Sequence, residues 1–103
     1  MGKTISEWIQ GCHGTARDKG FWDKERNVGE MLMLIVSELG EAVEAHRMNR
    51  HGLLQKDTFE DEIADTAIRL FDLCGGLGID LEKQIEWKTS FNKTREAKHG
   101  KAY

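Results

Sequence analysis

The sequence predicts an all-α protein, and three features of it carry that prediction. Proline is absent and charged residues make up 32% of the 103 residues, a balance that suits long amphipathic helices better than turn-rich sandwiches. Capping residues recur along the chain, and apolar residues follow three- and four-residue spacing. The length fits one domain over residues 1–103. Because a helical layer of this size buries only a modest core, a partner chain is expected.

Four helix starts are predicted from capping residues that are followed three positions later by a partner side chain. These pairs are Thr4 with Glu7, Asn27 with Glu30, Asp57 with Glu60, and Asp80 with Lys83. Glycine accepts the left-handed conformation that ends helices, and the predicted stops are Gly20, Gly52 and the group Gly75, Gly76 and Gly78. The predicted helices are 4–19, 28–50, 57–77 and 80–97.

The two middle helices each carry an apolar stripe at three- and four-residue spacing. The stripes are Leu32, Ile35, Val36, Leu39 and Val43 on the first, and Ile63, Ala67, Leu70, Phe71 and Cys74 on the second. We therefore expect these helices to form an antiparallel hairpin.

Composition excludes several classes of protein. The net charge of −3 gives no global attraction to duplex nucleic acid or to an anionic membrane. No apolar run approaches the roughly 20 residues needed to cross a bilayer. The two cysteines, Cys12 and Cys74, form no CxxC pair, and no signal peptide is recognisable, so a reduced cytoplasmic protein is expected.

Two acidic pairs are the main candidates for chemistry. Glu38 and Glu41 are three residues apart, as are Glu62 and Asp65, so each pair projects from one helix face with Cβ atoms about 5–6 Å apart. An all-carboxylate set suits hard cations such as Mg²⁺ or Mn²⁺. The alternative is that the acids belong to solvated helix surfaces. Gly40, in mid-helix, suggests a close approach by a neighbouring helix or by a ligand.

The segment Ser37-Glu38-Leu39-Gly40-Glu41-Ala42, followed by Glu62-Ile63-Ala64-Asp65, resembles the ExxE and ExxD motifs of the MazG-like all-α nucleoside triphosphate pyrophosphohydrolases. The resemblance extends from Gly20-Phe21-Trp22 to Lys98-His99-Gly100-Lys101. It implies a four-helix MazG-like bundle completed by dimerisation, or by a dimer of dimers. It also implies Mg²⁺ held by the four acids and hydrolysis of a nucleoside triphosphate, often a deoxynucleotide, to monophosphate and pyrophosphate, with house-cleaning of nucleotides as a plausible purpose.

Within that chemistry, bound metal would neutralise the triphosphate and activate water, leaving one carboxylate to position or deprotonate the nucleophile. Glu38 and Glu41 are the predicted catalytic acids, and Glu41 is the one chosen to position or deprotonate the nucleophile. The resemblance also places phosphate contacts in the last helix, where Lys88, Asn92 and Arg95 are spaced to share a face. His99 is a further candidate in the tail. A solvated basic helix end is the alternative.

A nucleobase would need an aromatic platform, and Trp22, after Gly20-Phe21, is the predicted one; it is otherwise a packing anchor. Trp8 and Trp87, within amphipathic helices, are expected at a core or an interface. The remaining histidines, His13, His46 and His51, match no metal-ligand spacing.

Two other functions compete with hydrolysis. A di-iron carboxylate bundle would use Glu-x-x-His pairs, and neither Glu38 nor Glu62 has histidine three positions later. A non-enzymatic helical adaptor with an acidic interaction face would explain the charges without a metal, but it explains the acids and the basic tail together less well.

Overall fold

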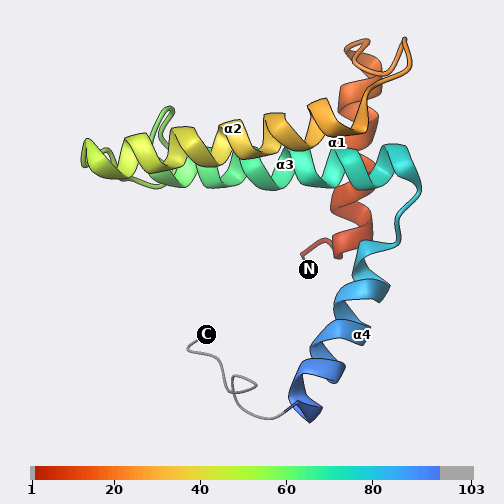
Figure 1. The fold of residues 1–103 in the computed structure, drawn as a ribbon. Helices are drawn as coiled ribbons and strands as arrows, with labels where there is room; N and C mark the ends of the chain where they lie inside the picture. The colour runs from red at the N-terminus through yellow and green to blue at the C-terminus, as the bar shows by residue number, and fades with distance from the viewer. Residues whose placement is uncertain (1, 96–103) are drawn as a thin grey trace.

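The structure, a computed structural model, describes residues 2–95 and contains four α-helices and no strand within that range. They are α1 (Ile5–Asp18), α2 (Val28–Arg47), α3 (Phe59–Leu77) and α4 (Leu81–Thr94). In Figure 1, α2 and α3 lie side by side as a long antiparallel hairpin, α1 crosses one end of it, and α4 extends away from it. The predicted all-α class, the four helices and the hairpin are confirmed.

Three of the predicted helix starts are confirmed. Thr4 closes a reciprocal capping box: its hydroxyl accepts from the Glu7 amide at 3.1 Å, and its own amide donates to Glu7 Oε1 at 2.8 Å. Asn27 and Asp80 cap α2 and α4 through their side-chain oxygens. Each cap satisfies an amide that the helix itself leaves without a partner.

The predicted cap at Asp57 is wrong by one residue. Thr58 is the N-cap of α3, and its hydroxyl accepts from the Asp61 amide at 3.2 Å. Asp57 instead has a positive φ of 63° in the preceding turn. Both residues are of the capping type, and the sequence could not say which of two neighbours would enter the helix.

The predicted stop of α2 at Gly52 is also wrong. The helix ends at Arg47, Asn49 takes a left-handed φ of 58°, and the Arg50 amide donates to the Ala45 carbonyl at 2.8 Å. This is a Schellman arrangement in which asparagine takes the position usually held by glycine. Gly78, with φ of 68°, ends α3 as predicted.

Gly75 and Gly76 do not end α3 but lie inside its last turns. A Cβ at Gly76 would overlap the Trp22 ring, and one at Gly75 would overlap the His13 side chain. These glycines therefore let α1 and the loop after it pack directly on α3.

The seam between α2 and α3 is built from small side chains. Ala42 and Ala45 are almost fully buried, while Val36 and Val43 of the predicted stripe are 51% and 55% exposed. Ile63 of the other stripe is 43% exposed. The apolar stripes of α2 and α3 therefore contribute only part of the packing between these two helices, and most of their large side chains are exposed to solvent.

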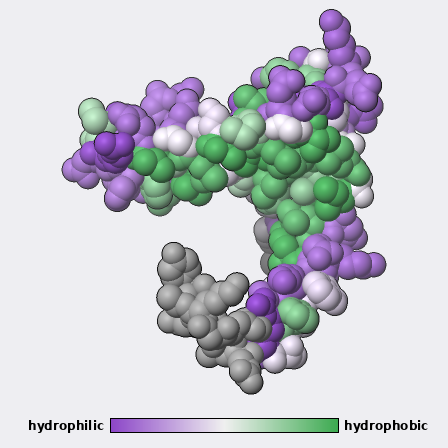
Figure 2. All heavy atoms as spheres, in the orientation of Figure 1, coloured by the Kyte–Doolittle hydropathy of each residue, from purple (hydrophilic) through white to green (hydrophobic). Residues whose placement is uncertain are grey.

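The molecule has more surface than a closed domain of its size. Its accessible area is 8212 Å², against about 5,900 Å² expected for a compact protein of this mass. Figure 2 shows hydrophobic side chains gathered along the α2 and α3 hairpin and on toward the start of α4. No helix within residues 2–95 is long and apolar enough to cross a membrane.

Candidate metal centre

Carboxylates from the second half of α2 and the first two turns of α3 converge. Oxygen atoms of Glu38, Glu41 and Glu62 lie within 4.8 Å of one another, and so do oxygen atoms of Asp61, Glu62 and Asp65. Glu62 joins the two groups. The structure thus brings the four sequence-predicted acids into one cluster, hereafter the acidic cluster: Glu38, Glu41, Glu62 and Asp65.

Glu38 is largely enclosed, because only 12% of its side chain is open to solvent. Burial raises the pKa of Glu38 to about 7, and a hydrogen bond with Glu41 adds to the shift. The Arg69 guanidinium, with its Nε 3.7 Å from Glu38 Oε1, acts in the opposite direction. The charge of Arg69 therefore offsets only part of the increase in the pKa of Glu38 that burial and Glu41 cause.

Glu62 is affected in the same way from the α3 side. Its pKa is raised, first by burial and then by the negative charge of Glu41 and by Asp65. Oxygen-only donors at this separation match the preference of Mg²⁺ and Mn²⁺. A divalent cation here would remove the repulsion that raises the pKa values of Glu38 and Glu62.

Asp61 is an acid that the sequence motifs did not single out. Its Oδ2 accepts from the Asp57 amide at 2.9 Å, so it holds the turn before α3 while it contributes to the second group of carboxylates. The regular three-residue spacing drew attention to Glu62 and Asp65. The adjacent acid in the first helical turn was the signal that could have added Asp61.

A cavity of about 800 Å³ adjoins the acidic cluster, between α1, the loop after it, α2 and α3. Glu38 and Asp65 lie in its wall. The wall also carries two aromatic side chains, Trp8 and Phe21, and four cationic ones: Lys3, Lys19, Arg26 and Arg69. Lys3, Lys19 and Arg26 reach this wall because α1 crosses the hairpin here (Figure 1), an arrangement that residue spacing does not predict.

Trp22 is held in place by the surrounding protein. Its Nε1 donates to Asp72 Oδ1 at 2.8 Å, and its ring meets His13 edge to face at a centroid separation of 5.1 Å. The ring also lies against Gly76. Trp22 does not line the cavity of about 800 Å³ that adjoins the acidic cluster but lines a separate cavity of about 420 Å³. This geometry favours the packing-anchor interpretation, and base contact by Trp22 stays a prediction.

Asp72 connects three parts of the chain. Its side chain is 12% exposed, lies 2.9 Å from His13 Nδ1 on α1, and lies 3.4 Å from Arg26 Nη1 in the loop. The Arg26 guanidinium is also 5.1 Å from the centre of the Trp22 ring. These contacts hold the Arg26 side chain at the wall of the cavity.

Of the candidate phosphate contacts, Lys88 and Asn92 lie on α4, whereas Arg95, predicted inside a helix over 80–97, is the C-cap residue after Thr94 and has an extended backbone. Lys88 Nζ and the Arg95 guanidinium lie 5.0 Å and 5.6 Å from the centre of the Phe91 ring, and Arg95 Nη1 is 3.5 Å from Asn92 Oδ1. However, α4 runs away from the hairpin (Figure 1), and the structure does not bring these side chains to the acids of the same chain. His99 lies outside the described residues.

Within residues 2–95, a single chain does not bury Trp8 and Trp87, and it does not make the close approach expected at Gly40. Trp8 and Trp87 are 48% and 58% exposed, so neither belongs to a core within the chain, and an interface role stays a prediction. A Cβ at Gly40 would meet no atom within 4 Å. The close approach expected at this glycine is therefore not made by the described residues.

Known proteins give no further guide. No protein-family model, no curated protein and no solved structure matches the chain.

Proposed function

We propose that this chain is a Mg²⁺-dependent pyrophosphohydrolase of the MazG-like kind, which converts a nucleoside or deoxynucleoside triphosphate to the monophosphate and pyrophosphate. The observation that carries the proposal is the acidic cluster in contact with a cationic and aromatic cavity of about 800 Å³. That volume is within the range of about 300–1,000 Å³ typical of small-molecule sites. Removal of non-standard nucleotides is the purpose that fits this activity.

Glu38, Glu41, Glu62 and Asp65 would hold the cation, and Mn²⁺ would substitute for Mg²⁺. Three of these four acids have carboxylate oxygens within 4.8 Å of one another, and Asp65 lies equally close to Glu62. When bound, the cation supplies charge neutralisation of the triphosphate and activation of water.

Glu41 is our choice for the acid that orients the attacking water and accepts its proton. It is the exposed member of its group, so substrate and water can reach it. Oxygen of the water forms a bond to the α-phosphorus, the bond from that phosphorus to the bridging oxygen breaks, and pyrophosphate leaves with the bonding electrons. The proton from the water passes to the Glu41 carboxylate.

The cavity supplies contacts to the rest of the substrate. Arg26 and Arg69 are planar, permanently charged donors that suit phosphate oxygens. Trp8 and Phe21 offer ring surfaces in the same cavity wall for a base. Lys88, Asn92 and Arg95 would act on the substrate of a neighbouring copy, since α4 extends away from its own acidic cluster.

A second copy of the chain is part of the proposal. Large apolar side chains on α2 and α3 are exposed, among them Val36, Val43 and Ile63. Stable interfaces between proteins bury about 800 Å² on each partner, and the excess accessible area of this chain is ample for that. A dimer, or a dimer of dimers, would give the chain the core that a single copy lacks.

Pyrophosphate release from a panel of canonical and modified nucleotides, with Mg²⁺ or with EDTA, tests the proposal. We expect turnover that EDTA abolishes and that depends on the base. If a folded, metal-loaded protein turns over no nucleotide, the alternative gains weight, a helical adaptor whose acidic face binds a basic partner. Capture of a defined basic peptide through Glu41 and Glu62 would then support the adaptor.

A further inference from the structure

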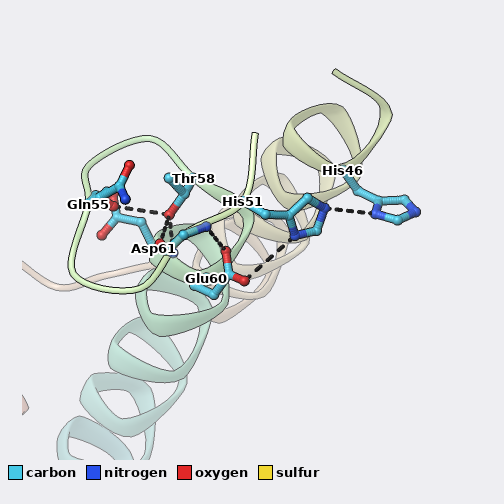
Figure 3. A network of polar contacts seen from close by, with 7 residues as sticks. His46, His51, Gln55, Thr58, Glu60 and Asp61 are labelled. Carbon is cyan, nitrogen blue, oxygen red and sulfur yellow. Dashed lines mark hydrogen bonds and ion pairs between the residues drawn. The ribbon is translucent and has the colours of Figure 1, made fainter. Parts of the chain in front are cut away.

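We propose that His46 and His51 form a second metal site, for a borderline divalent cation such as Zn²⁺, at the end of the hairpin far from α1. His46 lies in the last turn of α2, and His51 lies in the loop that leads to α3. The two rings approach each other through one nitrogen each: His46 Nδ1 is 3.2 Å from His51 Nε2 (Figure 3). The acidic cluster and the proposed hydrolysis are independent of this site.

The separation of the two nitrogens suits chelation. Imidazole nitrogens bound to one tetrahedral Zn²⁺ at about 2.0–2.1 Å lie about 3.3 Å apart. Without a cation, the same short separation accommodates a hydrogen bond in which one ring donates to the other. The rings stand nearly perpendicular, with an interplanar angle of 87°, and both residues are exposed, so an ion and its remaining water ligands can approach.

Glu60 selects the nitrogen that His51 presents. The Glu60 carboxylate lies 3.6 Å from His51 Nδ1 and is itself fixed by the Gly52 amide, which donates to Oε1 at 2.8 Å. A proton on Nδ1, facing this carboxylate, leaves the lone pair on Nε2, directed toward His46 (Figure 3). Histidine that binds a metal through one nitrogen and faces a carboxylate through the other is a recurring arrangement, and the carboxylate strengthens the ligand.

The loop that carries His51 is held in place before any ion binds. The Phe59 amide donates to the Arg50 carbonyl at 2.8 Å, and the Thr58 hydroxyl donates to the Gly52 carbonyl at 2.9 Å. The Phe59 ring packs against both imidazoles, with centroids 5.8 Å from His46 and 5.0 Å from His51. Such fixed ligands lose little conformational entropy when the cation binds.

The sequence alone did not single out this pair, because residues five apart do not share a helical face. Four intervening residues fall within the His–His spacing of zinc fingers, but no CxxC pair accompanies them here. The Schellman turn at Asn49 reverses the chain and folds His51 back over the end of α2. Nitrogen donors prefer Zn²⁺, Ni²⁺ or Cu²⁺ to Mg²⁺, whereas the carboxylates of the acidic cluster have the opposite preference. The two sites are therefore separable by the choice of metal.

Long-range ¹H–¹⁵N NMR of the histidine rings, with one equivalent of Zn²⁺ and excess Mg²⁺, tests the site directly. We expect His46 Nδ1 and His51 Nε2 to shift on addition of Zn²⁺. His13, whose ring faces Asp72, serves as the internal control and should not shift. Unchanged signals from His46 and His51 at saturating Zn²⁺ would overturn the proposal.

Calorimetric Zn²⁺ titration of variants provides the second measurement, after circular dichroism has shown that each variant is folded. His46→Gln and His51→Gln should each weaken binding at least tenfold, and Glu60→Gln should weaken it by about 10–100-fold, as loss of a supporting carboxylate does elsewhere. Glu41→Gln should leave this binding unchanged. Zn²⁺ affinity that is lost in Glu41→Gln but kept in His51→Gln would assign the ion to the acidic cluster and refute the histidine site.

Discussion

Arg69 Nε lies 3.7 Å from Glu38 Oε1, so the enclosed carboxylate of the acidic cluster has a cationic neighbour on the next helix. The Arg69 side chain is 43% exposed while that of Glu38 is only 12% exposed. Since solvent screens the more exposed partner, this ion pair compensates little of the cost of enclosing Glu38. The acidic cluster is therefore a place where the chain gives up stability, as functional sites often do.

Neutralising Glu38 or Asp65 should remove metal-dependent activity and leave the fold intact. Glu38→Gln and Asp65→Asn each keep side-chain volume while they delete a charged oxygen ligand, so we expect loss of turnover by about 100-fold or more. Activity assays and circular dichroism measure the two effects. Glu44→Gln, an exposed change on the same helix, is the matched control and should retain full activity. Retained turnover in Glu38→Gln would contradict the assignment.

The metal-free protein should become less stable as the pH rises toward neutrality. Enclosure raises the pKa of Glu38 to about 7, so between its ordinary pKa and 7 the folded state binds a proton that the unfolded state releases. The free energy of unfolding must then fall as pH rises through that window. Thermal unfolding in EDTA at several pH values checks this.

Glu38→Gln provides the control for that pH dependence. It should flatten the decline and raise the melting temperature of the metal-free protein near neutral pH, because a neutral amide carries no ionisation cost. Mg²⁺ should stabilise the parent protein and have a much smaller effect on the variant. A parent protein that gains stability across the same pH window would contradict the assigned environment of Glu38.

Much of the fold was readable from the sequence because its determinants are local. Thr4, Asn27 and Asp80 cap the helices at which they were expected to act, since a cap needs only its own helix turn. The three-residue spacing of Glu38 with Glu41, and of Glu62 with Asp65, likewise fixes each pair on one face. Their meeting across the hairpin followed from the antiparallel packing of two consecutive helices, α2 and α3.

What the sequence did not give depends on contacts between distant segments. Arg26 lies in the cavity wall because Asp72, which is distant in the sequence, and Trp22, which is close, both contact its guanidinium. Gly76 looked like a helix stop, yet its role is to admit the Trp22 ring. The apolar spacing also placed Val36 and Val43 on one helix face. It could not show whether that face packs against the same chain or against a second copy.

Removing the charge of Asp72 should destabilise the junction between α1, the loop and α3. Asp72→Asn keeps the volume and can still accept from Trp22, but it loses the carboxylate's contact with His13 and its ion pair with Arg26. We expect a loss of about 1–3 kcal/mol in the free energy of unfolding, measured by urea denaturation. Asp23→Asn, at an exposed loop position, should change it by less than about 0.5 kcal/mol. Equal losses in the free energy of unfolding for the two variants would contradict the stabilising role assigned to Asp72.

A charge on the exposed apolar face should dissociate the oligomer. Val36→Glu places a carboxylate where we expect a second copy, whereas Leu54→Glu alters a fully exposed residue in the loop between α2 and α3. Light scattering should give a species of at least twice 11.8 kDa for the parent and for Leu54→Glu, and a smaller one for Val36→Glu. A parent protein that remains at 11.8 kDa at micromolar concentration would refute the dimer.

The most direct test of the proposed chemistry is the position of the new oxygen atom after hydrolysis in ¹⁸O-labelled water. With Mg²⁺ and a triphosphate that the protein turns over, ³¹P NMR should show the label in the monophosphate and none in pyrophosphate, and EDTA should stop the reaction. Label in pyrophosphate, release of inorganic phosphate alone, or turnover that persists in EDTA would contradict attack at the α-phosphorus within a metal-dependent site formed by Glu38, Glu41, Glu62 and Asp65.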